Sequence, residues 1–162
     1  MKKLSLLFIL LLSLCAQTHA QESIIKDFAE PRRPTRWMNP LCLYPSTLRM
    51  VNVSQDPTFN ELVNDIEKVL IYTLDSATIA TKTYGDFLDE YESEGYEEYI
   101  TLYGKQHLKI IGKDDEYVGV MAAEGNALCF YLRGSIPFAK IPELIQSFRS
   151  NDLLPMITDQ FK

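Results

Sequence analysis

The segment from Tyr96 to Arg133 constrains the fold more than any other part of the chain, because side chains alternate along it with a period of two. Such alternation places successive side chains on opposite faces of a β-sheet. Polar loops interrupt the runs at residues 113–116 and at Glu124-Gly125-Asn126, where glycine readily adopts the positive φ of a tight turn. The segment therefore predicts three or four strands joined by hairpins.

The alternation also predicts which side chains face the core. The more apolar set is assigned inward: Leu108, Ile110, Val118, Val120, Ala122, Leu128, Phe130 and Leu132. The opposite set contains Tyr117, Met121, Tyr131 and Arg133. Because exposed aromatic, Met and Arg side chains are frequent in binding surfaces, these four are the candidate binding residues.

The flanking segments predict further strands and three amphipathic helices. Strands are expected at 48–53 and 69–74, and helices from Asp56-Pro57, from Asp75-Ser76 and over 138–148. The expected fold is an α+β two-layer sandwich, in which three helices pack on one face of a mainly antiparallel sheet of about five strands. A ferredoxin-like arrangement is compatible with this order.

The first 20 residues have the features of an export signal. Lys2 and Lys3 precede an apolar run that is too short for the ~20 residues of a membrane-spanning helix. Thr18-His19-Ala20 matches a cleavage site, which would leave Gln21 as the first residue. Cys15 raises lipid anchoring as a minority alternative, although Leu14 is a poor residue before a lipidated cysteine. We expect export to the periplasm or cell envelope of a Gram-negative bacterium.

Processing makes the chain more acidic. Loss of Lys2 and Lys3 leaves 14 basic against 22 acidic side chains, a net charge of −8 instead of −6. This charge argues against nucleic acid as a partner. The mature chain contains no apolar run long enough to cross a membrane.

The remaining chain divides into two parts. Residues 21–45 form a proline-rich lead-in segment, in which regular structure is not expected because Pro31, Pro34, Pro40 and Pro45 restrict the backbone. Residues 46–162 form the single α+β domain. The lead-in is expected to pack across the outside of that domain, with a partner-binding segment as the alternative.

Little in the sequence indicates catalysis. His107 is the one histidine beyond the leader, and no motif has metal-ligand spacing or the glycine pattern of a phosphate-binding loop. We therefore predict no metal and no cofactor, and favour a non-enzyme. An acidic stripe beside Asp89 and Glu90 is interpreted as a solvated helix face.

Two features invite covalent interpretations. Cys42 and Cys129 are the two cysteines after cleavage, and in an oxidising compartment they are a candidate disulfide, with two buried free thiols as the alternative. Asn52-Val53-Ser54 matches an N-glycosylation acceptor, and Asp75-Ser76-Ala77 an O-glycosylation pattern that a helix cap explains equally well.

Residues 48–148 resemble the domain-of-unknown-function 4252 family of exported bacterial proteins. The resemblance is carried by YEEYITLYG (96–104), YVGVMAAEGNALCFYLRG (117–134) and IPFAKIPELI (136–145). It implies a small exported α+β domain with no assigned activity.

The function predicted from these observations is a non-enzymatic binding module whose partner is an envelope protein or ligand. The alternative is a small hydrolase or ligand-binding protein with a cleft near His107.

Overall fold

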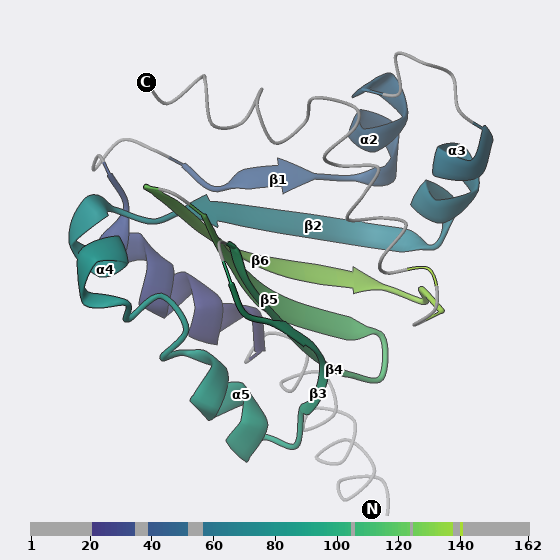
Figure 1. Cartoon of the computed structure of the whole chain (residues 1–162). Helices are drawn as coiled ribbons and strands as arrows, with labels where there is room; N and C mark the ends of the chain where they lie inside the picture. Colours follow the sequence, from purple (N-terminus) through teal and green to yellow (C-terminus); the bar gives the residue numbers. More distant parts are fainter. Residues whose placement is uncertain are drawn as a thin grey trace, which may run out of the picture.

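A computed structural model describes residues 21–34, 39–51, 57–104, 106–123, 125–137 and 140. Its centre is a six-stranded antiparallel sheet with the strand order β1-β2-β6-β5-β4-β3 (Figure 1). The strands are β1 (Leu41–Leu43), β2 (Ile66–Thr73), β3 (Glu97–Leu102), β4 (Gln106–Lys113), β5 (Glu116–Ala123) and β6 (Asn126–Gly134). The α+β class and the antiparallel sheet are confirmed, with one strand more than expected.

Consecutive strands from β3 to β6 are joined by tight turns, as the alternation predicted. The β4–β5 turn is shorter than expected, because Lys113 already pairs with Glu116 and only Asp114 and Asp115 lie between them. Asp114 has a φ of 54° and Gly125 a φ of 83°. These positive values are those that two-residue hairpin loops require.

The segment 48–53, predicted as a strand, begins inside a helix instead. Helix α2 (Pro45–Val51) starts at a proline, which is favoured in the first turn because it has no N–H to satisfy. Leu48 is fully buried, whereas Met50 is 82% exposed. A strand would have put both side chains on one face, and a helix turns them about 200° apart. Residues 52–56, including the Asn52 acceptor, lie outside the described part of the chain.

Helix α3 (Pro57–Asn64) confirms the helix expected after Asp56-Pro57. The next predicted helix is split into α4 (Ser76–Thr81) and α5 (Leu88–Ser93). Asp75 caps α4 by accepting the Thr78 N–H at 2.7 Å, as predicted. Helix α4 ends because Lys82 adopts a left-handed conformation with a φ of 56°. The helix predicted over 138–148 lies outside the described residues.

The lead-in segment contains regular structure, contrary to the prediction. Residues 21–29, here called the N-terminal helix, are helical, and a short 3-10 turn, η1 (Glu30–Arg32), follows. The prolines did not prevent this, because Pro31 lies beyond the helix, within η1. Ile25 and Ala29 are fully buried, one helical turn apart. Strand β1, from the same segment, pairs with β2 at one edge of the sheet.

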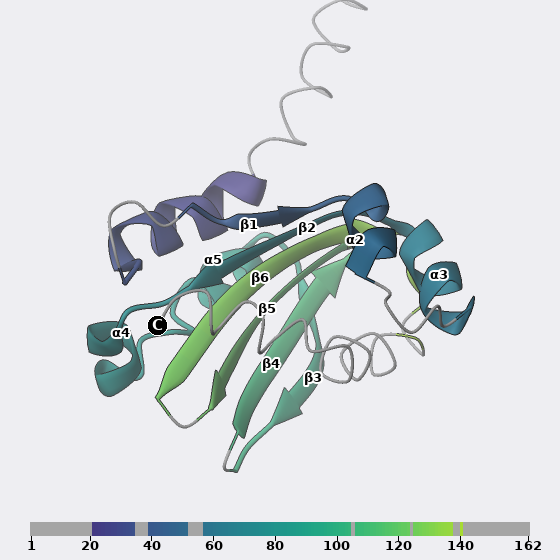
Figure 2. The same ribbon diagram turned by 90° about the horizontal axis from the view of Figure 1, so that it is seen from above.

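Both faces of the sheet are covered. We call one the α4–α5 face, where the N-terminal helix, α4 and α5 pack, and the other the α2–α3 face, where α2 and α3 contribute Leu48, Phe59 and Val63 (Figures 1 and 2). The expectation that all helices lie on one face is therefore wrong. Strands β2, β5 and β6 have buried side chains on both faces, so helices or other segments must shield both faces of the sheet from water.

The predicted inward set is also divided between the faces. Ile110 pairs with Gly119, and Ile111 with Val118. Ile110 thus shares the α2–α3 face with Leu128 and Leu132, whereas Val118, Val120 and Ala122 face α4 and α5. Alternation within each strand was identified correctly. The prediction was wrong in how neighbouring strands match, because a one-residue difference in register moves a strand's inward set of side chains to the opposite face of the sheet.

Candidate functional site

The four candidate binding residues do not share a surface. Tyr117 pairs with Leu132, and Val118 pairs with Tyr131, so Tyr117 and Tyr131 point to opposite faces. Tyr117 and Met121 lie on the α2–α3 face, whereas Tyr131 lies on the α4–α5 face. The single sheet face that the alternation assigned to these four residues, either partly covered or open to a partner, is therefore not formed: in the described part of the molecule they are divided between two covered faces.

Tyr117 is a core residue. Its hydroxyl donates a 2.7 Å hydrogen bond to the carbonyl oxygen of Ile136, which fastens the chain after β6. Burial raises the pKa of Tyr117, with smaller contributions from Tyr99 and Asp115. Met121 is half-buried against the same cluster. These contacts explain both side chains by packing.

A buried carboxylate lies at one end of the α4–α5 face. Glu116, only 6% exposed, accepts hydrogen bonds from Tyr131 at 2.7 Å and from Tyr96 at 2.5 Å. Burying a carboxylate is costly unless donors replace the lost water, and two phenolic O–H groups do so here. We call Glu116, Tyr96 and Tyr131 the carboxylate–tyrosine cluster.

This cluster is not predicted from the sequence, because the polar run at 113–116 assigns Glu116 to a loop. The signal for a buried Glu116 was its spacing: Val118 and Val120 follow it by two and four residues in the same strand, so all three side chains point to one face. Because Val118 and Val120 are buried, Glu116 must point into the same core. A carboxylate there requires donors, and Tyr131, already singled out, is one of them.

Tyrosines on the α4–α5 face are held in their neutral forms. Burial raises the pKa of Tyr72 to about 12, and it raises the pKa values of Tyr91, Tyr96 and Tyr131 as well. For Tyr96 and Tyr131, the hydrogen bond to Glu116 adds to the effect, because a second negative charge beside the carboxylate is unfavourable. These groups donate hydrogen bonds and do not serve as bases near neutral pH.

Beside the cluster lies a polar cleft of about 660 Å³. The start of the N-terminal helix, α5, the β4–β5 turn and β6 form its walls, through Gln21, Ser23, Ile24, Glu90, Glu94, Lys113, Asp114, Asp115, Glu116 and Arg133. Five of these residues are acidic and two are basic. The cleft is therefore a region of negative potential unless a cation enters it.

The two basic side chains of the cleft are already engaged. Lys113 donates to the carbonyl oxygen of Glu94 at 2.7 Å. The guanidinium of Arg133 lies 3.2 Å from a carboxylate oxygen of Glu67 and 3.9 Å from one of Asp115. Arg133, a predicted binding residue, thus lines the cleft as part of an ion-pair network.

His107 lies away from this cleft. Its ring packs between two tyrosines, with centroids 5.5 Å from Tyr84 and 5.4 Å from Tyr103. A second cleft, of about 390 Å³ near Tyr117 and Ile136, does not include His107 either. Among the described residues, no group of three or more His, Cys, Asp or Glu side chains is arranged to hold a metal ion.

The two cysteines are free thiols in this structure, not a disulfide. Strand β2 lies between them, since Cys42 pairs with Leu70 and Cys129 pairs with Tyr72. Two strand spacings of about 4.8 Å exceed the ~7 Å limit for bridged Cα atoms. Burial raises the pKa of Cys129, which makes it a poor nucleophile.

No family model matches the chain, and searches of curated proteins and of solved structures each return no match. The resemblance to the domain-of-unknown-function 4252 family therefore stays a prediction. In the part of the chain that the structure describes, no helix has the length and apolar character needed to cross a membrane. Cys15 and Ala20 lie outside the described residues, so the lipidation and cleavage predictions are untested.

Proposed function

We propose that this protein is exported to the periplasm or cell envelope and acts there as a non-enzymatic binding module. The observation that carries the binding role is the end of β3, where Leu102 is 56% exposed and the next residue, Tyr103, is 81% exposed. Large apolar side chains in adjacent exposed positions are typical of protein contact sites, and tyrosine is frequent among their strongest contributors.

The position of these residues favours an extended partner segment. Among the described strands, β3 is the last in the sheet order and pairs with β4 alone, so its outer edge can accept another strand (Figure 2). The register shifts between Glu98 and Ile100, and Glu97 and Glu98 are exposed, which discourages pairing along the first half. The open half of β3 therefore runs from Ile100 to Leu102, and Tyr103 follows it directly.

Tyr103 is also partly fixed before a partner arrives. Its ring contacts that of His107, which in turn contacts Tyr84 on the loop before α5. A side chain held in place loses less conformational entropy on binding. On this proposal His107 supports a contact residue, and the partner is an envelope protein that presents an extended, partly apolar segment.

The proposal is tested by photo-crosslinking in cells, with the reactive amino acid placed at position 103 or at position 44. Tyr44 is 50% exposed at the opposite edge of the sheet, beside β1, and serves as the matched control. We expect a discrete adduct from position 103 that Leu102→Asp abolishes, and no such adduct from position 44. Equal labelling from both positions, or none from 103, would contradict the proposed surface.

The enzymatic alternative is tested separately with the purified protein and generic ester, phosphate and peptide substrates. The aromatic contacts of His107 favour no turnover by the wild type. Turnover that disappears in His107→Ala and persists in Tyr44→Ala would replace the binding proposal with a hydrolase.

A further inference from the structure

The α2–α3 face is buried over a wider area than its described helices cover. Helices α2 and α3 pack against β1 and β2, at one side of the sheet (Figure 2). Further across the same face, on β4, Leu108 is only 8% exposed and Ile110 only 1% exposed. Side chains on the face of a sheet stay in water unless a second layer packs over them. Another segment must therefore cover this side of β4 and β5.

The area beyond α2 and α3 contains a row of apolar side chains that crosses four strands. Leu108 pairs with Leu102 on β3 and with Met121 on β5, and Met121 pairs with Leu128 on β6. Partners directly opposite in antiparallel strands point to the same face. Leu128 and Leu108 are buried and Met121 is half-buried, whereas Leu102 is exposed. The cover therefore extends from β6 to β4 and ends before β3.

The chain that follows β6 is anchored at this face. Ile136 is buried in the same cluster, and its carbonyl oxygen accepts the hydrogen bond from Tyr117. A helical turn comes next, because the N–H of Lys140 donates to the carbonyl oxygen of Pro137 at 2.8 Å. Proline is favoured in the first turn of a helix. The chain therefore starts a helix beside the area that needs cover.

The sequence continues with the spacing of a one-sided helix. Residues 141–162 lie outside the described part of the chain and follow Lys140 directly. Their first apolar side chains are Ile141, Leu144, Ile145 and Phe148, at intervals of three, one and three residues. In a helix this spacing places all four on one face, and Gln146 points to the opposite side.

We propose that residues 141–148 form a helix that packs on the α2–α3 face over β6, β5 and β4 and completes its core. Eight helical residues span about 12 Å, and β6 spans about 13 Å from Leu132 to Leu128. A helix that leaves Lys140 and runs back along β6 is therefore long enough to bring Phe148 close to Met121, which pairs with Leu128. Leu102 stays open at the edge of the sheet.

Photo-crosslinking within the purified protein tests where this helix lies. Benzoylphenylalanine replaces Phe148, and its excited ketone takes a hydrogen from a nearby C–H bond before the two carbon radicals join. C–H bonds beside sulfur react readily, so we expect an intramolecular adduct with the peptide that contains Met121. The same amino acid in place of Gln146 is the matched control and should give no such adduct.

Three results of this crosslinking would overturn the proposal. The first is an adduct from position 148 with the N-terminal helix, α4 or α5, which lie on the other face. The second is an adduct between two molecules, found by mixing isotopically labelled and unlabelled protein, because a second copy would then be the cover. The third is an equal or absent yield of the Met121 adduct from the two positions.

Oxidation by hydrogen peroxide, which turns the methionine thioether into a sulfoxide and the peroxide into water, measures the cover itself. Met50 is 82% exposed and serves as the internal reference. We expect Met121 to be oxidised roughly tenfold more slowly than Met50 in the wild type and at a similar rate in Ile145→Asp. Gln146→Asp should leave the ratio unchanged. Equal rates in the wild type, or a slow Met121 in Ile145→Asp, would contradict the cover.

Thiol labelling of Cys129 distinguishes loss of the helix from loss of the whole fold. Cys129 is fully buried on the α4–α5 face, and we expect it to stay unreactive in Ile145→Asp. If it becomes reactive, the substitution has unfolded the protein, and the crosslink from position 148, which keeps an aromatic side chain there, decides the proposal.

Discussion

The two faces of the sheet have cores of different chemistry. On the α2–α3 face, Tyr117 is the one fully packed side chain of the cluster that carries a polar atom, among Leu, Ile, Val and Phe. The α4–α5 face contains Tyr72, Tyr91, Tyr96 and Tyr131, together with the carboxylate of Glu116. The first core is held mainly by apolar packing, with the hydrogen bond from Tyr117 to Ile136 added, and the second must satisfy a set of buried hydroxyl groups.

The two cores therefore contribute differently: one mainly stabilises the fold, and the other also fixes the relative positions of its elements. Apolar packing tolerates shifts of position, whereas buried polar groups lose their partners if the elements move. The tyrosines on the α4–α5 face fix where the N-terminal helix and α5 lie, and therefore shape the polar cleft that these two helices help to form. The α2–α3 face contributes burial without setting such a geometry.

The largest effect is expected on the apolar face. Phe59, on α3, is fully buried in its cluster. Phe59→Ala should lower the free energy of unfolding by about 3–5 kcal/mol, because it removes buried surface and leaves a cavity. Phe59→Leu keeps most of the volume and should cost about 1.5 kcal/mol or less. Urea unfolding measures both values, and similar losses from the two variants would show that α3 does not pack as described.

A smaller but more specific effect is expected at Glu116. Glu116→Ala should cost about 3 kcal/mol, because it leaves the hydroxyls of Tyr96 and Tyr131 buried without an acceptor. Glu116→Gln keeps an acceptor oxygen and should cost about 1 kcal/mol. If both variants unfold at the wild-type urea concentration, the carboxylate is not a buried acceptor.

The two faces should also differ in the size of their response to alkali, because on the α2–α3 face only Tyr117, among the cluster's fully packed residues, has a raised pKa. The pKa of Tyr72 is raised to about 12, and those of Tyr91, Tyr96 and Tyr131 are raised too, above the ~10 of the unfolded chain. The folded state therefore binds more protons, so stability is full below pH ~10 and falls as the pH rises beyond it.

Each such tyrosine adds up to about 1.4 kcal/mol per pH unit to this loss. Lys68 and Lys109, whose pKa values are also raised, act in the same direction. Tyr72→Phe should reduce the slope between pH ~10 and ~12, as measured by urea unfolding at several pH values. An unchanged slope in Tyr72→Phe would contradict the burial of its hydroxyl.

The smallest effect is expected outside both cores. Lys109 contacts Glu92 at 2.6 Å, and hydrogen bonding to Glu92 raises the pKa of Lys109. Because Glu92 is 41% exposed, Glu92→Gln should cost less than about 1 kcal/mol. The difference from wild type should vanish at ~1 M salt, where such pairs are screened. A loss that persists in high salt would mean that this pair belongs to the buried network.

The sequence predicted the strands well because alternation is a local signal. From β4 to β6 the strands lie where Leu108 to Arg133 alternate. Pairing between strands is not local, and the registers that place Ile110 opposite Gly119 exchanged the expected faces. The helix at Leu48 was missed because five or six residues fit either period, and Pro45 was a stronger signal than the alternation.

The candidate site was less predictable than the fold. Glu116 and Tyr96 are far apart in sequence, and neither belongs to a motif. The N-terminal helix was hidden by the prolines that follow it, although Ile25 and Ala29 have helical spacing. Its importance becomes visible only when Tyr91, 70 residues away in sequence, is seen bonded to Gln21.

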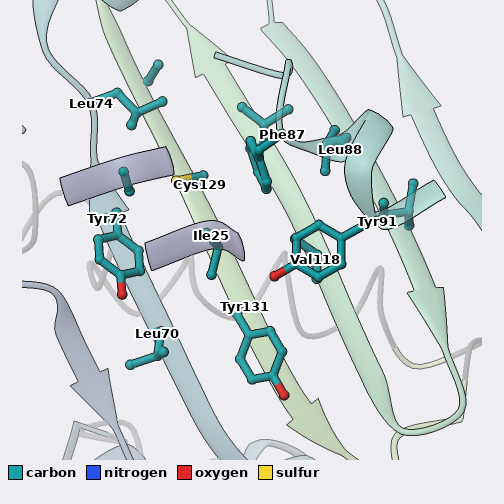
Figure 3. Close-up of a cluster of buried hydrophobic side chains, with 14 of the residues drawn as sticks. Ile25, Leu70, Tyr72, Leu74, Phe87, Leu88, Tyr91, Val118, Cys129 and Tyr131 are labelled. Carbon is teal, nitrogen blue, oxygen red and sulfur yellow. The ribbon is translucent and has the colours of Figure 1, made fainter. Parts of the chain in front are cut away.

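The central claim is that the N-terminal helix is part of the core of the α4–α5 face, and thiol labelling of the chain beginning at Gln21 tests it most directly. Cys129 lies beneath this helix (Figure 3). It is fully buried, whereas Cys42 is only half-buried. We predict that Cys42 is alkylated in the native protein, that Cys129 is not, and that Ile25→Asp makes Cys129 reactive. Rapid labelling of native Cys129, or a need for reductant before either cysteine reacts, would contradict the account.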